Sequence, residues 1–265
     1  MELQAGEGRV IAAAGLGRVL VATAVSVERD AVAEALGELS PGSVETTLGA
    51  AGRAHPPPSP SGTTAHGGSG IDVVAVGVGP GLAGASTASV LTAAALEGTP
   101  YDLVVSAGIG GGFLPGASVG SLVVADEIVA ADLGAETDDG FLSVTELGFG
   151  TVSHKPPEDL VRPVADALGA RTGAVLTVST VTGTAERAAV LRERHPTALA
   201  EAMEGFGVAE AAAVHGVPVL EVRAISNPVG PRDRAAWRIP DALAALTEGF
   251  GKLVPVLESW NRHDQ

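Results

Sequence analysis

An acid before a helical stretch and three polar residues at the end of a strand are the first sign of chemistry in this sequence. Glu204 precedes the Ala-rich run GFGVAEAAAV, and Arg223, Ser226 and Asn227 close the run VPVLEVRAISN. A short, apolar, β-branched run predicts a buried strand. In an open α/β sheet, ligands bind beyond the carboxyl ends of the strands. We therefore expect these four side chains to meet at one crevice.

Four pieces of sequence resemble a known protein superfamily. They are SAGIGGGF at 106–113, MEG at 203–205, RAISN at 223–227 and GPRDRAAW at 230–237, and they occur in this order at compatible spacing. Together they resemble the nucleoside phosphorylase and nucleosidase superfamily, and the first and last resemble its futalosine hydrolase family in particular. The resemblance extends in pieces from about Val19 to Leu257, apart from residues 38–70.

The resemblance implies both a fold and a reaction. The fold is a three-layer α/β/α sandwich with a central mixed β-sheet. The reaction is hydrolysis of the N-glycosidic bond of futalosine, a purine nucleoside of a menaquinone pathway, to hypoxanthine and dehypoxanthine futalosine. A homo-oligomer, either a dimer or a tetramer, is also implied. Two alternatives stay open: a purine nucleoside phosphorylase acting on inosine or guanosine, and a non-catalytic nucleoside-binding protein.

Length and composition favour a single nucleosidase domain over residues 18–260. With 265 residues, of which 46% are apolar, the chain can bury a sizeable core, and no clear linker divides it. Residues 1–17 are rich in Gly and Ala and predict a loose extension. Residues 38–70 are rich in Pro, Gly, Ser and Thr, which predicts a surface hairpin or a partly disordered insert. His55 and His66 lie in this insert, and we interpret them as solvated rather than metal-binding.

Hydrophobic patterning predicts the elements that position the polar residues. Strands are expected at 18–25, 71–80, 101–113, 118–134 and 217–226, and the segment 171–194 is expected to run strand, loop, helix. Further helices are expected at 27–36, 81–98, 156–170 and 242–260, the last one broken near Gly249–Gly251. Asp126 and Glu127 are expected at the end of their strand, in a structural role. The segment 135–156 is expected to be irregular, and His154 within it is interpreted as structural rather than as an active-site residue.

The charge balance argues against several classes of partner. The formal net charge is −15, whereas nucleic acids and anionic membranes are bound through basic surfaces. The chain has no cysteine, which excludes disulfides and thiolate metal sites. No uncharged apolar run reaches the roughly 18 residues that a membrane span needs, and the N-terminus lacks the basic region of a signal peptide. We expect a cytoplasmic protein that binds a small-molecule nucleoside without a metal or an organic cofactor.

Two glutamates and a methionine are assigned roles by the resemblance. Glu204 would accept hydrogen bonds from the ribose hydroxyls and stabilise the developing oxocarbenium ion. Met203 would pack against the sugar. Glu28, at the junction between the first strand and the first helix, would orient or deprotonate the attacking water. The alternative for Glu28 is a solvated acid at a helix start, where the helix dipole favours negative charge.

Backbone groups are expected to contact the nucleoside at two places. Gly108, Ile109 and Gly110 lie in the glycine run, where the chain can approach a ligand with no side chain between them. The resemblance places this turn along the base and the sugar, although an ordinary tight turn would have a similar composition. It also places the main chain of Thr180 and Val181 against the purine.

Asn227 carries information about the leaving base. The adenine-specific nucleosidases of the superfamily have Asp at this place, and an aspartic acid can protonate N7. An Asn amide cannot act as an acid, but it can donate an N–H to N7 or O6. Asn227 therefore favours a 6-oxopurine such as hypoxanthine or guanine over adenine, and Ser226 and Arg223 are expected to bind beside it.

The sequence favours water over phosphate as the nucleophile. A phosphate dianion needs arginine or helix-terminal donors. The first strand-to-helix turn reads AVSVERD, and its one basic residue, Arg29, is expected to face solvent.

The segment PRDRAAWRI should form a loop and a short helix over the pocket. Trp237 lies about where related nucleosidases place an aromatic residue over the 5′ substituent, which in futalosine is a carboxylated aryl ketone. We predict that Trp237 stacks on it and that Arg232, Arg234 or Arg238 binds the carboxylate. The alternative is that these arginines form surface ion pairs with the neighbouring aspartates.

Overall fold

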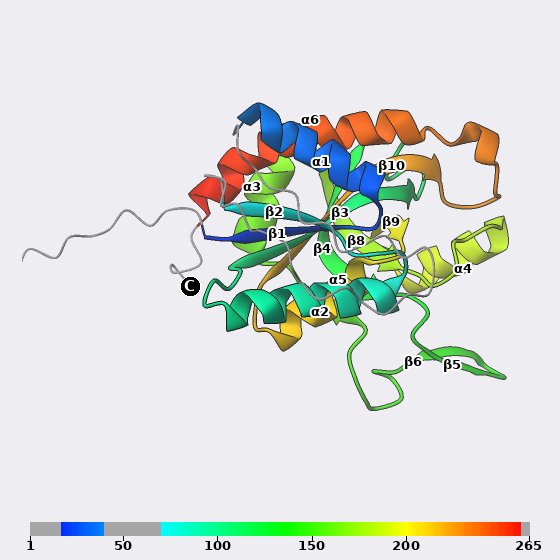
Figure 1. Ribbon diagram of the computed structural model, residues 1–265. Coiled ribbons are helices and arrows are strands. Elements are labelled where there is room, and N and C mark those ends of the chain that lie inside the picture. The colour runs from blue at the N-terminus through cyan, green and yellow to red at the C-terminus, as the bar shows by residue number, and fades with distance from the viewer. Residues whose placement is uncertain (1–16, 40–69, 261–265) are drawn as a thin grey trace, which may run out of the picture.

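A mixed β-sheet with helices on both of its faces forms the body of the protein (Figure 1). The computed structural model describes residues 17–39 and 70–260. The main sheet contains β1 (Val19–Thr23), β2 (Ile71–Ala75), β3 (Leu103–Gly112), β4 (Leu122–Ala130), β7 (Ser153–His154), β8 (Arg171–Thr177), β9 (Ala198–Ala202) and β10 (Val219–Pro228). The expected three-layer arrangement is confirmed.

Two of the three apolar clusters among the described residues hold five helices against the two faces of the sheet, and the third includes Leu191 of the helix after β8. One packs α1 (Ser26–Leu39), α3 (Glu158–Leu168) and α6 (Ile239–Ser259) on one face, and the other packs α2 (Pro80–Leu96) and α5 (Gly205–Val214) on the opposite face. Helix α4 (Ala185–Arg194) lies beyond the sheet, and β5 (Gly134–Thr137) and β6 (Gly140–Ser143) form a hairpin that projects from the body (Figure 1). No helix in the described ranges is long and apolar enough to cross a membrane.

Part of the sheet closes into a ring of strands, whereas we expected an open sheet from the sequence. Strand β10 pairs in parallel with β3 and antiparallel with β4, while β9 pairs with both β8 and β3. Because β4 also pairs with β8, the five strands β3, β10, β4, β8 and β9 form a ring, and β1 and β2 extend from it. Strand β3 is long enough to have three partners, so its last glycines lie between β10 and β9.

Several element predictions need correction. Residues 198–202, which we did not expect to be a strand, form β9. Helix α6 is continuous through Gly249–Gly251, where Gly249 packs beside Leu122. Asp126 and Glu127 lie at a β-bulge inside β4 rather than at its end. Helix α1 continues to Leu39. Residues 1–16 of the predicted N-terminal extension and residues 40–69 of the predicted insert, with His55 and His66, lie outside the described residues.

Candidate active site

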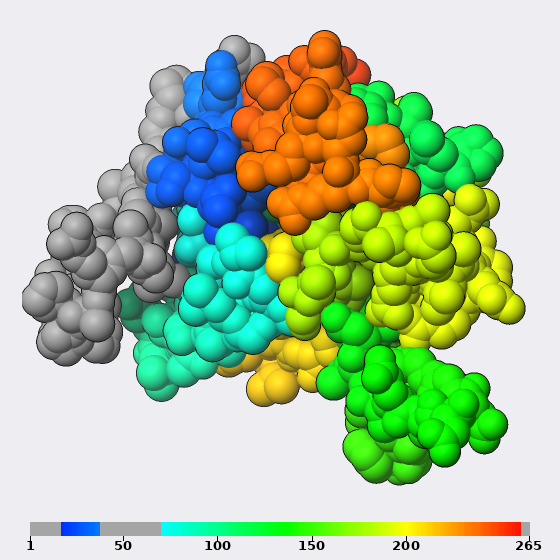
Figure 2. Space-filling view, turned by 90° about the vertical axis from the view of Figure 1, so that its right-hand side faces the viewer, coloured from blue at the N-terminus to red at the C-terminus, as the bar shows by residue number. Residues whose placement is uncertain are grey.

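A cavity of about 210 Å³ lies at the carboxyl ends of β1, β3 and β10. Figure 2 faces this end of the molecule, where the starts of α1 (blue) and α2 (cyan), the α4 segment (yellow-green) and the segment before α6 (orange) come together. The predicted residues that line the cavity are Glu28, Ile109, Gly110, Val181, Met203, Glu204, Ser226, Asn227 and Trp237. The chain therefore brings both predicted acids and the predicted base-binding amide to one place.

The remaining predicted residues do not line this cavity. Thr180 is exposed beside it, and Gly108 lies behind it, where an added Cβ would be 2.6 Å from the Glu28 Oε1 atom. Arg223 is fully buried beneath the cavity. The arginines 232, 234 and 238 are exposed around Trp237. These positions separate residues that can touch a ligand in the cavity from residues that can act only through others.

Glu28 is buried and firmly held. It is only 3% exposed, so it is not the solvated helix-start acid of the alternative interpretation. Its Oε2 atom accepts hydrogen bonds from the Ala24 and Val25 amides at 3.0 and 3.3 Å, and its Oε1 atom accepts one from the Ile109 amide at 2.8 Å. Burial raises the pKa of Glu28, and the Ile109 hydrogen bond and the Arg223 charge oppose this shift. A buried carboxylate with a raised pKa is a suitable general base for water.

Glu204 is oriented by the turns before α2 and α5 and by a buried arginine. Its Oε1 atom accepts a hydrogen bond from the Gly79 amide at 3.3 Å, and its Oε2 atom accepts one from its neighbour Met203 at 3.3 Å. The Nη1 atom of Arg223 lies 3.5 Å from Oε2. These contacts fix the carboxylate at the edge of the cavity, next to the Met203 side chain that should pack on a sugar.

Arg223 lies buried beneath the cavity and is not part of its lining. It is 1% exposed and donates to the Glu221 Oε1 atom at 2.8 Å and to the Ser106 hydroxyl at 3.0 Å. Glu221 is fully buried, and burial raises its pKa while Arg223 lowers it. Charged groups buried in this way need compensation. Arg223 supplies it to Glu221, Glu204 and Glu28 together, so the predicted direct contact with substrate does not fit its position.

The Asn227 amide is held by its neighbours. Its Oδ1 atom accepts from the Ser226 hydroxyl at 2.9 Å, and its Nδ2 atom donates to the Pro228 carbonyl oxygen at 3.0 Å. An amide nitrogen carries two N–H groups. The second N–H of Asn227 can therefore serve a ligand in the cavity, which agrees with the donor role inferred from the sequence.

Trp237 follows the short 3-10 helix η1 (Arg234–Ala236) and covers one side of the cavity. The guanidinium carbons of Arg232 and Arg234 lie 5.8 and 6.0 Å from the centre of its ring. Arg238 instead pairs with Asp241 at 2.9 Å on the surface, as the alternative interpretation had it. Arg232 and Arg234 thus remain beside the aromatic ring.

One more basic residue departs from expectation. Arg29 is 9% exposed and pairs with Asp30 at 2.7 Å, so the prediction that it faces solvent is wrong.

Among the described residues that line the cavity, none is a lysine or an arginine. Nor does any group of three or more His, Cys, Asp or Glu side chains in the described residues have an arrangement that could hold a metal ion.

The sequence analysis missed a third acid in the cavity, Glu201. It is 4% exposed, and its Oε1 atom accepts from the Thr182 amide at 2.8 Å while Oε2 accepts from the Thr182 hydroxyl. Burial raises its pKa, and the bonds from Thr182 oppose this shift. The Ala-rich surroundings of Glu201 gave no strand signal, and only its position two residues before the MEG motif could have drawn attention to it.

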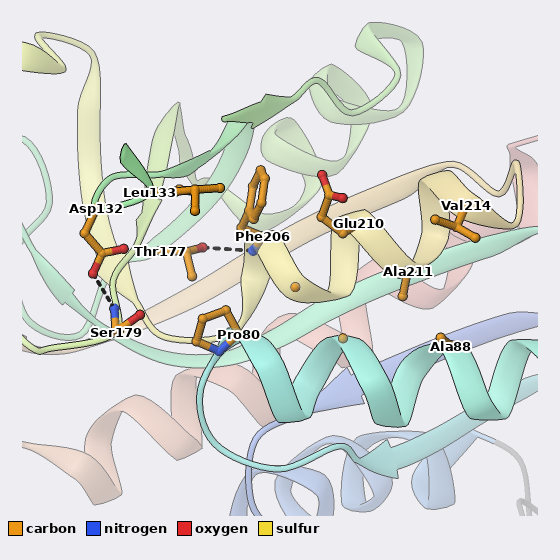
Figure 3. A pocket seen from close by; sticks show the side chains of 13 residues that line it. Pro80, Ala88, Asp132, Leu133, Thr177, Ser179, Phe206, Glu210, Ala211 and Val214 are labelled. Atoms are coloured by element: carbon orange, nitrogen blue, oxygen red, sulfur yellow. Dashed lines mark hydrogen bonds between the residues drawn. The ribbon is translucent and has the colours of Figure 1, made fainter. Parts of the chain in front are cut away.

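A larger hollow, of about 420 Å³, lies between α2, α5 and the segment after β4 (Figure 3). Its lining is mostly small and apolar, as at Ala88, Ala211 and Val214. Asp132 in its wall accepts a hydrogen bond from the Ser179 amide at 2.7 Å. His154 lies near this face and contacts Glu210 at 2.7 Å. Neither Glu28, Glu204 nor Asn227 lines this hollow, so its size does not make it the site of the chemistry.

Comparison with known proteins gives one family model and several similar proteins. Residues 15–253 match the Phosphorylase superfamily. The chain is 69% identical over 247 residues to futalosine hydrolase of Streptomyces coelicolor, covering 93% of this chain and 99% of that protein. It is 43% identical over 239 residues to futalosine hydrolase of Acidothermus cellulolyticus, covering 88% and 89% of the two chains. The solved structure of futalosine hydrolase of Helicobacter pylori strain 26695 superposes with a TM-score of 0.69 at 18% identity, covering 91% and 98%, and shares the fold.

The burial of Glu28 predicts the pH dependence of catalysis. We expect kcat/KM to fall on acidification with a midpoint above 4.5, the ordinary pKa of glutamate, because activation of water needs the carboxylate and burial raises its pKa. Glu28→Gln should lower kcat at least about 100-fold and remove this limb from the pH profile. A residual activity of Glu28→Gln that keeps the same acid limb would assign the ionisation to another group.

Proposed function

Since this chain belongs to the phosphorylase superfamily, and within it to the futalosine hydrolase family, we propose that it hydrolyses the N-glycosidic bond of futalosine in menaquinone biosynthesis. The products are hypoxanthine and dehypoxanthine futalosine. One observation carries the proposal: Glu28, Glu204 and Asn227 are buried and line one cavity. Among the described residues that line this cavity, none has a basic side chain. Hydrolysis needs an activated water, a stabilised sugar cation and a stabilised leaving base, and these three residues supply one each.

The reaction follows from the chemistry of these groups. The C1′–N9 bond breaks, and its electron pair leaves with the purine. Asn227 donates a hydrogen bond to N7 or O6, which stabilises the departing base but supplies no proton. Glu204 accepts hydrogen bonds from the ribose hydroxyls, and its carboxylate lies beside the positive charge that develops on the sugar.

Water completes the reaction on the other side of the sugar. Its oxygen bonds to C1′, and Glu28 takes its proton, so the product is a sugar with a hydroxyl at C1′. The base receives its proton from solvent, and Glu28 releases its own. Ile109 donates its amide to Glu28 rather than to the ligand, which keeps the base in place through the cycle.

The 5′ substituent is assigned to the region around Trp237. We propose that its aryl ring stacks on the Trp237 indole and that Arg232 or Arg234 binds its carboxylate, because both guanidinium groups already lie near the ring. Arg238 is less suited, since Asp241 occupies it.

A homo-oligomer is part of the proposal, and α2 and α5 are the face that we assign to a second copy of the chain. The hollow between these helices is lined by small residues, and Val214 at its edge is 81% exposed. Leu133 beside it and Phe149 in the next segment are also exposed. Burial of these apolar groups by a second copy would stabilise a dimer. A single domain over residues 18–260 and a cytoplasmic location remain predictions from the sequence.

The reaction is tested by incubating the protein with futalosine, inosine and methylthioadenosine, each with and without phosphate, and measuring the free base. We expect hypoxanthine from futalosine at a rate that phosphate does not change. Glu28→Gln serves as the control for contaminating activity. Release that requires phosphate would assign the protein to the phosphorylases, release of adenine would contradict the role of Asn227, and binding without turnover would favour a nucleoside-binding protein.

The role of the arginines beside Trp237 is tested with the double variant Arg232→Gln, Arg234→Gln. Its KM for futalosine should rise about tenfold or more, because a charge-assisted pair is lost, while its KM for any slower substrate that lacks the 5′ aryl group, such as inosine, stays unchanged. Arg238→Gln is the matched control and should leave both values unchanged. An equal rise in KM for both substrates would show that the arginines act on the fold of the loop instead.

Self-association is tested by light scattering coupled to size exclusion. We expect a dimer or a larger assembly for the natural protein, and dissociation to monomers for Val214→Glu, which places a charge in the apolar face. Val190→Glu is the control, because Val190 is 44% exposed on α4, away from this face. A monomeric natural protein, or equal effects of both substitutions, would contradict the assignment.

A further inference from the structure

Two polar side chains of the cavity are neighbours in one row across the sheet, with a glycine between them. Asn227 of β10 pairs with Gly111 of β3, and Gly111 pairs on its other side with Glu201 of β9. Neighbouring strands lie about 4.8 Å apart, so the backbones of Asn227 and Glu201 are separated by about 10 Å. Asn227, Gly111 and Glu201 all line the cavity.

Gly111 keeps the space between the two side chains open. A Cβ atom added there would lie 3.3 Å from the Asn227 Nδ2 atom and 2.9 Å from a methyl of Val229. A side chain at this place would fill the gap from which the amide and the carboxylate can be reached. The row therefore places a hydrogen-bond donor and an acceptor on opposite sides of a slot whose floor is a glycine.

Glu201 has acceptor capacity that its present partners do not use. Each oxygen of a carboxylate can accept two hydrogen bonds. The Thr182 amide and hydroxyl each donate one bond, to different oxygens. No lysine or arginine in the described residues donates a hydrogen bond to Glu201, and the charges that act on it are those of Arg187 and Asp132. The carboxylate is thus oriented by Thr182 and left able to accept from a ligand.

We propose that Glu201 is a specificity-determining residue that accepts the N1–H of a 6-oxopurine base while Asn227 donates to the O6 and N7 edge. The proposal rests on the proposed function and adds a second residue that recognises the base. A 6-oxopurine carries a hydrogen on N1, so it can donate to Glu201. A 6-aminopurine has a bare lone pair on N1, which would face the carboxylate without a proton between them.

The competing explanation is that Glu201 only holds the segment 179–183 in place through Thr182. The two explanations differ in what they predict for the base. A positioning role would affect all nucleosides alike, since the same segment lies beside every base. If Glu201 recognises the base directly, its replacement affects the binding of only those bases that carry a hydrogen on N1.

Binding of free bases separates the two explanations without any turnover. Hypoxanthine and 1-methylhypoxanthine are titrated by calorimetry into the natural protein, Glu201→Gln and Thr182→Val. In Glu201→Gln the Thr182 amide can still bond to the remaining oxygen, while the negative charge and one acceptor oxygen are lost. We expect hypoxanthine to bind this variant about 10- to 100-fold more weakly, because a hydrogen bond to a charged group is lost, and 1-methylhypoxanthine to bind both proteins alike.

Thr182→Val is the matched control. It removes the hydroxyl that bonds to Glu201 but keeps the carboxylate, so the preference for hypoxanthine over its N1-methyl derivative should persist. If Glu201→Gln weakens both bases equally, or if the natural protein does not distinguish them, the proposal is overturned. The comparison of the two bases on the natural protein keeps the test valid even where a variant folds poorly.

Turnover adds a second readout and separates this inference from the proposed function. The ratio of kcat/KM for futalosine to kcat/KM for its 6-amino analogue should decrease about 10- to 100-fold in Glu201→Gln and stay unchanged in Thr182→Val. Absence of any hydrolysis by the natural protein would contradict the proposed function, while the binding experiment would still decide the role of Glu201. Hydrolysis with an unchanged ratio in Glu201→Gln would overturn the inference alone.

Discussion

The site depends on the electrostatic interaction between the buried Arg223 guanidinium and the carboxylates around it. One guanidinium lies among three carboxylates, two of which line the cavity, and it is almost without contact with solvent. Burying an acid without a partner is costly, and burying several is tolerated only where a cation and hydrogen bonds compensate them. Removing the arginine would leave Glu221 and Glu204 together in a dry interior. The placement of the acids, and therefore the chemistry, is a property of this cluster rather than of any single residue.

The same cluster explains why glycines occur where they do. A Cβ at Gly108 would lie 2.6 Å from the Glu28 carboxylate and 2.8 Å from the Arg223 guanidinium. A Cβ at Gly205 would overlap the carboxylate of Glu221. In the sequence, the glycine run looked like a surface along which a ligand could lie. The structure shows two kinds of glycine in it: Gly110 and Gly111 face the cavity, and Gly108 makes room for the ions behind it.

Much of the fold and part of the site could be predicted, for a physical reason. Buried strands such as β10 are continuous apolar runs, and polar residues that interrupt such a run at its end, as Asn227 does, stand out. Burial of a charged residue has no such local signal, which is why Arg29 was expected in solvent and Arg223 was expected to touch the substrate. Strand β9 was missed because Ala-rich segments favour helix by propensity, and only pairing with β8 and β3 makes this segment extended. Glu201 was missed with it.

A β-bulge decides which side chains of β10 line the cavity. Ile225 pairs with Gly110, and Asn227, not Ser226, pairs with Gly111. In a regular strand, consecutive side chains point to opposite faces, so a strand without the extra residue would direct either Ser226 or Asn227 away from the cavity. The bulge lets both line it, and the Ser226 hydroxyl then fixes the Asn227 amide by bonding to its oxygen. Bulges are uncommon between parallel strands and are concentrated next to active sites. The irregularity of β10 thus completes the row of Asn227, Gly111 and Glu201. We expect a one-residue deletion that restores a regular ladder to abolish base recognition and to leave the buried ion cluster beneath it in place.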